Sequence, residues 1–242
     1  MRAEMPFSGK TALVAGGTGG LGKSVALAFL EQRARVAVTY RNRDEYAALE
    51  AAAGDPARGR LSGHVVDVTD EGAVRSLVDE LVQRDGRLDT LVNCVGGFAG
   101  GSKLWETGAK TFDRMLDLNF RSGLVLCRAV VPAMLARGGG AIVNVASRAA
   151  VDHGAGLAAY ASSKAAALAM IDSLAADLAG TGVRVNSILP SIIDTDANRR
   201  AMPNADFSKW PKPEEIARVI LFLCGDGARL IHSAAIPVYG SG

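Results

Sequence analysis

The sequence predicts an α/β protein with a doubly wound, seven-stranded parallel sheet and helices on both faces. Short β-branched and aliphatic runs alternate with longer segments of helical period, which is typical of βαβ units. The 242 residues fit one domain with a substantial core. No internal repeat and no Pro/Ser-rich linker divides the chain. We therefore expect a single domain over residues 1–242.

The elements follow from the order of these runs. Strands are expected at Thr11–Ala15, Arg35–Tyr40, Gly63–Val66, Thr90–Cys94, Ala141–Ala146, Arg184–Leu189 and Ala235–Val238. Helices are expected at Gly20–Gln32, Asp44–Ala53, Glu71–Arg84, Ala109–Ala136, Leu157–Ala179 and Pro213–Cys224. Residues 191–213 carry three prolines and little periodicity, and a loop of that length predicts a functional lid.

Composition limits the class of protein. Hydrophobic residues make up 49% and charged residues 21%, and no run approaches 18 apolar residues, which argues against disorder and a membrane span. Residues 1–9 lack the apolar core of a secretory signal, so a cytoplasmic location is expected. The 27 basic and 25 acidic residues are interspersed, which predicts no nucleic-acid partner. The three cysteines and three histidines are scattered, so no metal site is predicted.

A glycine-rich turn follows the first strand and opens into a helix. It reads Gly16-Gly17-Thr18-Gly19-Gly20-Leu21-Gly22. Glycines allow a tight turn and a close approach of phosphate to the backbone, and the N-H groups at a helix N-terminus attract anions. The turn therefore predicts a dinucleotide site, although a turn without a ligand is the alternative.

The end of the second strand bears on which cofactor is used. The strand ends at Tyr40-Arg41-Asn42-Arg43 rather than at an acidic residue. A carboxylate there would bind the adenosine ribose hydroxyls of NAD and repel a 2'-phosphate, whereas Arg41 or Arg43 would pair with that phosphate. Thr18 could add a hydroxyl to the same phosphate. NADP(H) is favoured over NAD(H), the alternative being that both arginines are solvated at a helix start.

Tyr160 and Lys164 lie four residues apart in a segment of helical period, so both project from one face of a helix, about 6 Å apart along its axis. A tyrosine hydroxyl titrates near ~10, and a nearby ammonium favours the tyrosinate. The pair is therefore a candidate for proton transfer. Such a pair alone is common by chance, and its surroundings decide its meaning.

Those surroundings resemble the short-chain dehydrogenase/reductase family along nearly the whole chain. Its glycine loop is matched by residues 15–22, its Asp after the third strand by Asp67, and its N-N-A-G strand end by Asn93-Cys94-Val95-Gly96. Its catalytic Asn, Ser, Tyr and Lys fall, at the usual spacing, on Asn119, Ser147, Tyr160 and Lys164. The resemblance implies a single-domain Rossmann fold and a nicotinamide cofactor.

The resemblance also implies a role for each residue. Tyr160 would be the general acid in carbonyl reduction and the base in alcohol oxidation, and Ser147 would hydrogen-bond the substrate oxygen. Lys164 would hold the nicotinamide ribose and lower the pKa of Tyr160, and Asn119 would position a water between Lys164 and solvent. The implied cofactor contacts are Gly16, Thr18, Gly19, Gly20, Leu21, Gly22, Tyr40, Arg41, Asn42, Asp67, Val68, Asn93, Val95, Gly96, Tyr160, Lys164, Pro190, Ser191, Ile193 and Thr195.

The sequence departs from the family pattern near the nicotinamide and in the lid. Ser191 replaces the usual Gly after Pro190, so a different backbone and a narrower nicotinamide pocket are expected there. Residues 194–210 are similar to the lid of dihydropteridine reductases, whereas the rest resembles 3-oxoacyl carrier-protein reductases and general ketoreductases. A ketone or 3-oxoacyl substrate is the leading expectation and pterin reduction the alternative. A non-catalytic NADP(H) sensor is a third hypothesis.

Two helices bear on association. Those that begin near Ala109 and Leu157 are rich in Ala, Leu, Met and Val, and the equivalent pair packs between subunits in family members. A homotetramer is the expectation, and a dimer comes next.

Overall fold

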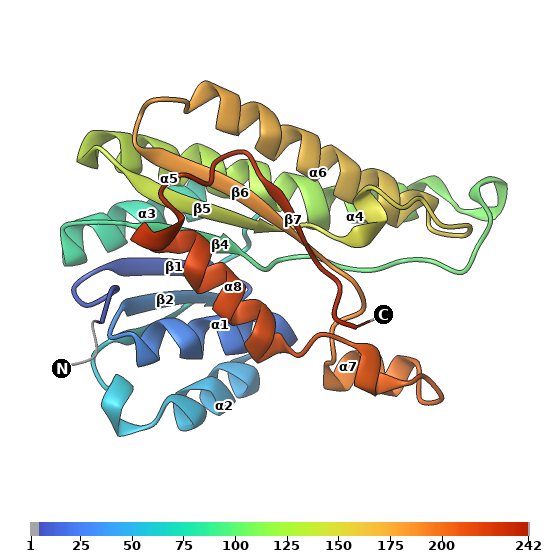
Figure 1. Ribbon diagram of the computed structural model, residues 1–242, viewed down its shortest axis with the longest axis horizontal. Helices are drawn as coiled ribbons and strands as arrows, with labels where there is room; N and C mark the ends of the chain where they lie inside the picture. Colours follow the sequence, from blue (N-terminus) through green and yellow to red (C-terminus); the bar gives the residue numbers. More distant parts are fainter. Residues whose placement is uncertain (1–4, 242) are drawn as a thin grey trace.

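The computed structural model describes residues 5–241 and forms one seven-stranded sheet with every neighbouring pair of strands parallel. The strand order is β3-β2-β1-β4-β5-β6-β7, so the chain reverses its direction of winding between β1 and β4. Helices cover both faces (Figure 1). The predicted fold class is confirmed, while residues 1–4 and 242 of the predicted domain lie outside the described part.

The predicted strands are all present, with ends shifted by at most two residues. The strands are β1 Thr11–Ala15, β2 Arg35–Tyr40, β3 Leu61–Val65, β4 Thr90–Asn93, β5 Gly140–Val145, β6 Val183–Pro190 and β7 Ala235–Val238. The α-helices are α1 Gly20–Glu31, α2 Arg43–Ala53, α3 Glu71–Asp85, α4 Ala109–Leu116, α5 Ser122–Arg137, α6 Ala158–Asp177, α7 Asp196–Ala201 and α8 Pro213–Cys224.

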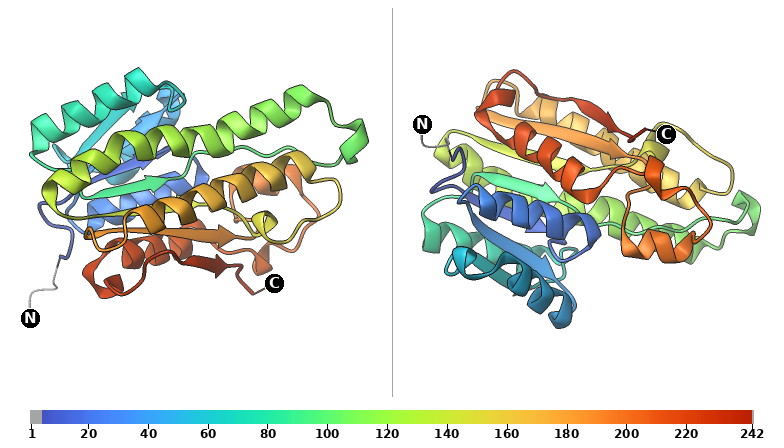
Figure 2. Two further views of the ribbon diagram at one scale, coloured as in Figure 1. Left: turned by 90° about the horizontal axis from the view of Figure 1, so that it is seen from above. Right: turned by 60° about the horizontal axis from the view of Figure 1, so that its bottom comes forward.

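The sheet separates two hydrophobic cores. Successive residues of a strand point to opposite faces, so Leu13 and Val14, both fully buried, belong to different cores. Helices α1, α2 and α8 cover the core that contains Val14, and α3, α5 and α6 cover the one that contains Leu13 (Figure 2). Burial on both faces explains why the strands read as nearly continuous apolar runs.

The long predicted helix is continuous over Ala109–Arg137, but it contains a π-helical turn, η3 (Asp117–Arg121), between α4 and α5. By length and composition alone this helix could cross a membrane. In the fold, however, its Val125, Val130 and Met134 are buried in the core against the sheet. It is built as the core helix of an α/β protein.

The predicted lid, residues 191–213, is more ordered than the sequence suggests, and it is called the lid below. The segment predicted as irregular contains α7 and the 3-10 turn η5 (Phe207–Lys209). Thr195 caps α7 by accepting a hydrogen bond from the Asn198 amide (3.2 Å). Both α7 and the extended segment before α4 project beyond the carboxyl ends of the strands (Figure 1).

Candidate active site

The four residues predicted to be catalytic come together at the carboxyl edge of the sheet. Asn119 lies in the π turn, Ser147 follows β5 and begins the 3-10 turn η4 (Arg148–Ala150), and the other two lie on α6. A side chain on Gly96, just after β4, would lie 2.9 Å from Asn119 Oδ1 and 3.1 Å from Lys164 Nζ. A glycine at this position therefore lets both polar groups approach the β4 strand end.

Lys164 is 5% exposed, and its Nζ donates a hydrogen bond to the carbonyl of Val145 (3.0 Å). Burial lowers the pKa of Lys164 to about 8, because desolvation disfavours the charged form. The amine is thus fixed by the end of β5 and remains mostly protonated at neutral pH.

Tyr160 shares a hydrogen bond with Ser147, which lowers its pKa, but burial has the larger effect and raises the pKa above the ordinary value. In this structure the Lys164 amine donates to Val145, and desolvation of the phenol is the largest influence on the Tyr160 pKa. A lowering of that pKa by Lys164 stays a prediction. Tyr160 is consequently a neutral phenol at pH 7, which is the protonation state of an acid.

Asn119 is a positioning residue in this geometry. Its Oδ1 accepts from the Gly97 amide (2.9 Å), and its Nδ2 donates to the Gly97 carbonyl (3.0 Å) and to Ser163 Oγ (2.9 Å). The side chain therefore ties the chain after β4 to α6. π turns of this kind often occur at functional sites.

The glycine loop is packed so closely that side chains would not fit. Gly16 has a φ of +70°, and a Cβ on Gly22 would collide with the Gly16 carbonyl. A Cβ on Gly20 would lie 2.7 Å from Cγ2 of Thr195, so the lid begins directly over the loop. Because α1 begins within this loop, the positive end of the helix dipole lies here. The glycine loop is therefore a cradle that fits an anionic pyrophosphate.

The part of the site that is predicted to bind the adenosine of the cofactor carries carboxylates as well as arginine. Arg41 Nη2 lies 3.8 Å from Asp67 Oδ1, and both side chains are exposed. Asp67 also accepts hydrogen bonds from the Thr69 amide and hydroxyl, which hold its pKa below the ordinary value. An open cavity of about 450 Å³ adjoins this end. It is lined by Arg41, Thr69, Lys110, Asp113, Arg114, Asp117 and Leu118.

Four other predicted cofactor contacts have defined places in the fold. Asn42 caps α2 by accepting from the Asp44 amide (2.9 Å). Asn93 accepts from the Val95 amide (3.2 Å) and so fixes the turn after β4. Tyr40 is buried, with its ring stacked on that of Tyr46 at 4.7 Å, and Val68 is buried as well.

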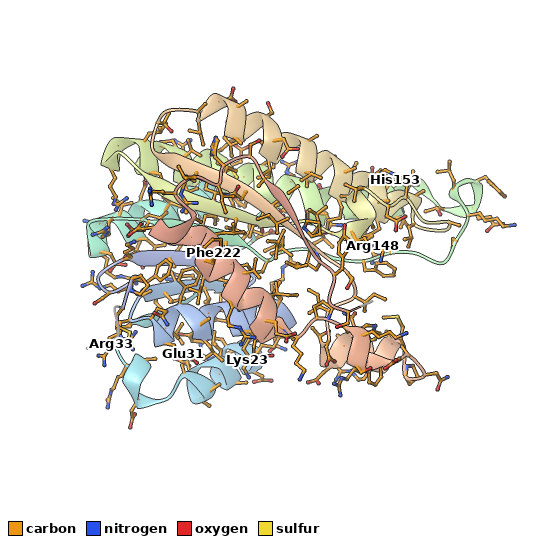
Figure 3. The ribbon with its side chains drawn as sticks, viewed as in Figure 1. Lys23, Glu31, Arg33, Arg148, His153 and Phe222 are labelled. Carbon is orange, nitrogen blue, oxygen red and sulfur yellow. The ribbon has the colours of Figure 1, made fainter. Side chains whose placement is uncertain are left out.

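Ser191 does not need the backbone freedom of glycine, because its φ lies outside the left-handed region. Its hydroxyl donates to the carbonyl of Tyr239 (2.7 Å), which joins the start of the lid to the C-terminal segment. Arg148, labelled in Figure 3, places its guanidinium 5.1 Å from the centre of the Tyr239 ring. The C-terminal segment is thus attached both to the lid and to the turn after Ser147.

Two residues at the site were not predicted from the sequence. Phe98, 66% exposed, packs edge-on against the Tyr160 ring with centroids 5.0 Å apart. Glu45, in the first turn of α2, accepts a hydrogen bond from the Thr18 hydroxyl (2.9 Å). An apolar residue shortly after the fourth strand could have indicated Phe98, but no local signal marks Glu45. Within residues 5–241, no three His, Cys, Asp or Glu side chains gather as metal ligands.

A doubly wound sheet with a glycine cradle at its switch point and a Ser–Tyr pair beside it defines a nicotinamide-dependent oxidoreductase. Comparison with known proteins narrows this class. The family model for short chain dehydrogenases matches residues 10–206. The chain belongs to the short-chain dehydrogenase/reductase family, and it is an oxidoreductase acting on CH-OH or C=O groups.

Several relatives match over almost the whole chain. The chain is 35% identical to D-threitol dehydrogenase of Mycolicibacterium smegmatis, covering 98% of this chain and 94% of the relative. It is 31% identical to a 3-oxoacyl-[acyl-carrier-protein] reductase of Thermotoga maritima, covering 98% of each. It is 32% identical to 7alpha-hydroxysteroid dehydrogenase of Escherichia coli, covering 99% and 96%.

Solved structures agree with this family assignment. A short-chain type dehydrogenase/reductase from Mycobacterium ulcerans superposes with a TM-score of 0.90 at 29% identity, covering 97% of this chain and 90% of that one. ElxO with NADP bound superposes with a TM-score of 0.87 at 26% identity, covering 96% and 97%. Both superpositions show the same fold over almost the whole chain.

Proposed function

We propose that the protein is an NADP(H)-dependent reductase of a ketone or 3-oxoacyl substrate, with Tyr160 as the general acid. The observation that carries the proposal is the hydrogen bond between Tyr160 and Ser147 at a phenol whose pKa is raised by burial. The relatives support the range of substrates, since their names include a polyol dehydrogenase, a 3-oxoacyl reductase and a hydroxysteroid dehydrogenase.

The bound cofactor supplies the hydride that reduces the carbonyl carbon. The Tyr160 hydroxyl gives its proton to the carbonyl oxygen, and the Ser147 hydroxyl stabilises the negative charge that develops there. Lys164, fixed by the Val145 carbonyl, binds the ribose and keeps a positive charge near the phenol. Asn119 holds the surrounding backbone and positions a water that connects Lys164 with solvent.

The glycine cradle and the residues at the strand ends would hold the cofactor. Gly16, Gly19, Gly20, Leu21 and Gly22 would surround the pyrophosphate, and Arg41 would pair with the 2'-phosphate. The NADP bound to ElxO supports the choice of phosphate-bearing cofactor. Asp67 and Val68 would bind the adenine, and Pro190 to Thr195 the nicotinamide.

We further infer that residues 1–242 form one catalytic domain with a lid at 191–213, and that the protein works as a cytoplasmic homotetramer. Analytical ultracentrifugation of the purified protein tests the oligomeric state. A monomer at micromolar concentration would contradict that inference.

The test of the function is NADPH oxidation with a panel of ketones and 3-oxoacyl thioesters. Tyr160→Phe is expected to lower kcat/KM by at least about 100-fold, because it removes the proton donor, with the Kd for NADPH nearly unchanged. Tyr239→Phe removes a hydroxyl outside the Tyr160–Ser147 pair and is the matched control. The proposal fails if no member of the panel is reduced, or if Tyr160→Phe retains wild-type activity.

The second candidate, pterin reduction, rests on the lid. In the lid, the centres of the Phe207 and Trp210 rings lie 4.9 Å apart, and the Arg199 guanidinium lies beside the Phe207 ring. The lid therefore holds a pair of neighbouring aromatic rings. Turnover of quinonoid dihydropterin as fast as the best ketone would favour this candidate. Tight NADPH binding with no hydride transfer to any substrate would instead favour the NADP(H) sensor.

A further inference from the structure

Two elements that flank the predicted 2'-phosphate position are joined by a carboxylate. Thr18, in the glycine loop, donates its hydroxyl proton to Oε2 of Glu45 (2.9 Å), which lies in the first turn of α2. The contact spans 27 residues of sequence and is exposed to solvent. Glu45 therefore places a negative charge beside the hydroxyl that was predicted to bind phosphate.

A second predicted phosphate contact, Arg41, also lies near a carboxylate. Arg41 lies 3.8 Å from Asp67, as described above. Two of the groups assigned to a 2'-phosphate, Arg41 and Thr18, thus face acidic side chains. A phosphate monoester adds close to two negative charges at pH 7 and must compete with both carboxylates. A ribose 2'-hydroxyl carries no charge and can donate a hydrogen bond to either.

We propose that Glu45 is a second determinant of cofactor choice that opposes Arg41. Its carboxylate repels the 2'-phosphate and withholds the Thr18 hydroxyl, so it lowers the affinity for NADPH and leaves that for NADH nearly unchanged. The protein accordingly binds NADH as well as NADPH. This inference rests on the proposed function, because it assumes that the adenosine ribose lies between Arg41 and Thr18.

The test is the Kd of NADPH and of NADH, each titrated by quenching of the intrinsic tryptophan fluorescence. Glu45→Gln removes the charge and keeps an amide oxygen that accepts from Thr18. It is expected to lower the Kd of NADPH about fivefold or more and to change that of NADH less than twofold, as for one exposed like charge at short range. The gain for NADPH should shrink in 0.5 M salt.

Asp44→Asn is the matched control. It removes the same charge from the same helical turn, where no contact joins Asp44 to Thr18. Its Kd values should stay within twofold of wild type. The inference is overturned if Glu45→Gln leaves the ratio of the two Kd values unchanged, or if Asp44→Asn shifts it equally.

Arg41→Ala separates this inference from the proposed function. If Arg41→Ala weakens NADPH binding and Glu45→Gln strengthens it, both stand. If Arg41→Ala has no effect while Glu45→Gln still improves NADPH binding, the role of Arg41 fails and that of Glu45 holds. If the wild-type protein and Glu45→Gln bind neither cofactor, both are overturned.

Discussion

At the residue scale, the protonation state of Tyr160 depends on how much water reaches it. Burial raises its pKa, and the ring of Phe98 supplies part of that burial by packing against it. A neutral phenol suits reduction, because the acid must hold its proton until the carbonyl oxygen takes it. Above its pKa the tyrosinate cannot donate, so reduction should fall as pH rises through that value.

Phe98→Ala should shift this pH dependence. Removing the ring admits water, so the pKa of Tyr160 should fall toward its ordinary value near ~10. The falling limb of kcat/KM for reduction should then move to lower pH, and the measurement is the pH profile of NADPH oxidation. Trp105→Ala, an exposed aromatic on the same segment, should leave the limb in place. An unmoved limb in Phe98→Ala would contradict the argument.

The residues of the site divide by the range of the interactions that place them. Gly16 and Lys164 lie within local patterns, a loop after a strand and a spacing along a helix, from which they were predicted, whereas Ser147 was assigned through the family resemblance. Phe98 and Glu45 act through contacts with residues 62 and 27 positions away. Such contacts depend on the tertiary fold: the apolar character of Phe98 after the fourth strand was the one local signal, and none marks Glu45.

At the element scale, the strands and the long helices were predictable, and the short helix α7 and the π turn were not. α7 has only six residues, too few to show a helical period, and short helices need tertiary contacts to form. The π turn has the same apolar period as the helix around it. Its extra residue is fixed by the Asn119 hydrogen bonds to Gly97 and Ser163, which come from other elements.

The contacts of Arg199 hold the lid together. Its guanidinium binds both oxygens of Asp194 (2.5 and 2.8 Å) and lies 4.9 Å from the Phe207 ring centre. Arg199→Ala should therefore speed amide hydrogen exchange in residues 194–210 at least about tenfold, with exchange in the sheet unchanged.

The control for the lid is Arg200→Ala, which changes the neighbouring exposed arginine, for which the structure shows no ion pair. It should exchange like the wild type. Equal exchange in Arg199→Ala and wild type, measured by mass spectrometry of peptic fragments, would mean that the lid is held by other contacts.

At the scale of the whole molecule, the parallel sheet explains why distant motifs form one site. Every strand runs the same way, so the residues after β1, β4, β5 and β6 all reach one edge. The glycine loop, Gly96, Ser147 and the lid follow these four strands in turn. The location of the site was therefore implied once the βαβ pattern was recognised, although the contacts within it were not.

Burial of Lys164 in this core has a consequence for global stability. Its pKa falls to about 8 on folding, so between pH 8 and 10.5 the unfolded chain holds a proton that the folded chain has lost. The free energy of unfolding therefore gains about 1.4 kcal/mol per pH unit from this group, about 3 kcal/mol in all. Below pH 8 the buried Lys164 amine is protonated in the folded protein, so the whole free-energy cost of burying its charge still lowers the stability.

Lys164→Met removes this titration, so its stability relative to wild type should be highest at pH 7 and decline from pH 8 to 10.5. Urea unfolding at one protein concentration, repeated at each pH, measures the difference. Lys110→Met, which changes an exposed lysine outside the core, is the matched control. A pH-independent difference for Lys164→Met would mean that Lys164 keeps its ordinary pKa and that the fold holds it in contact with water.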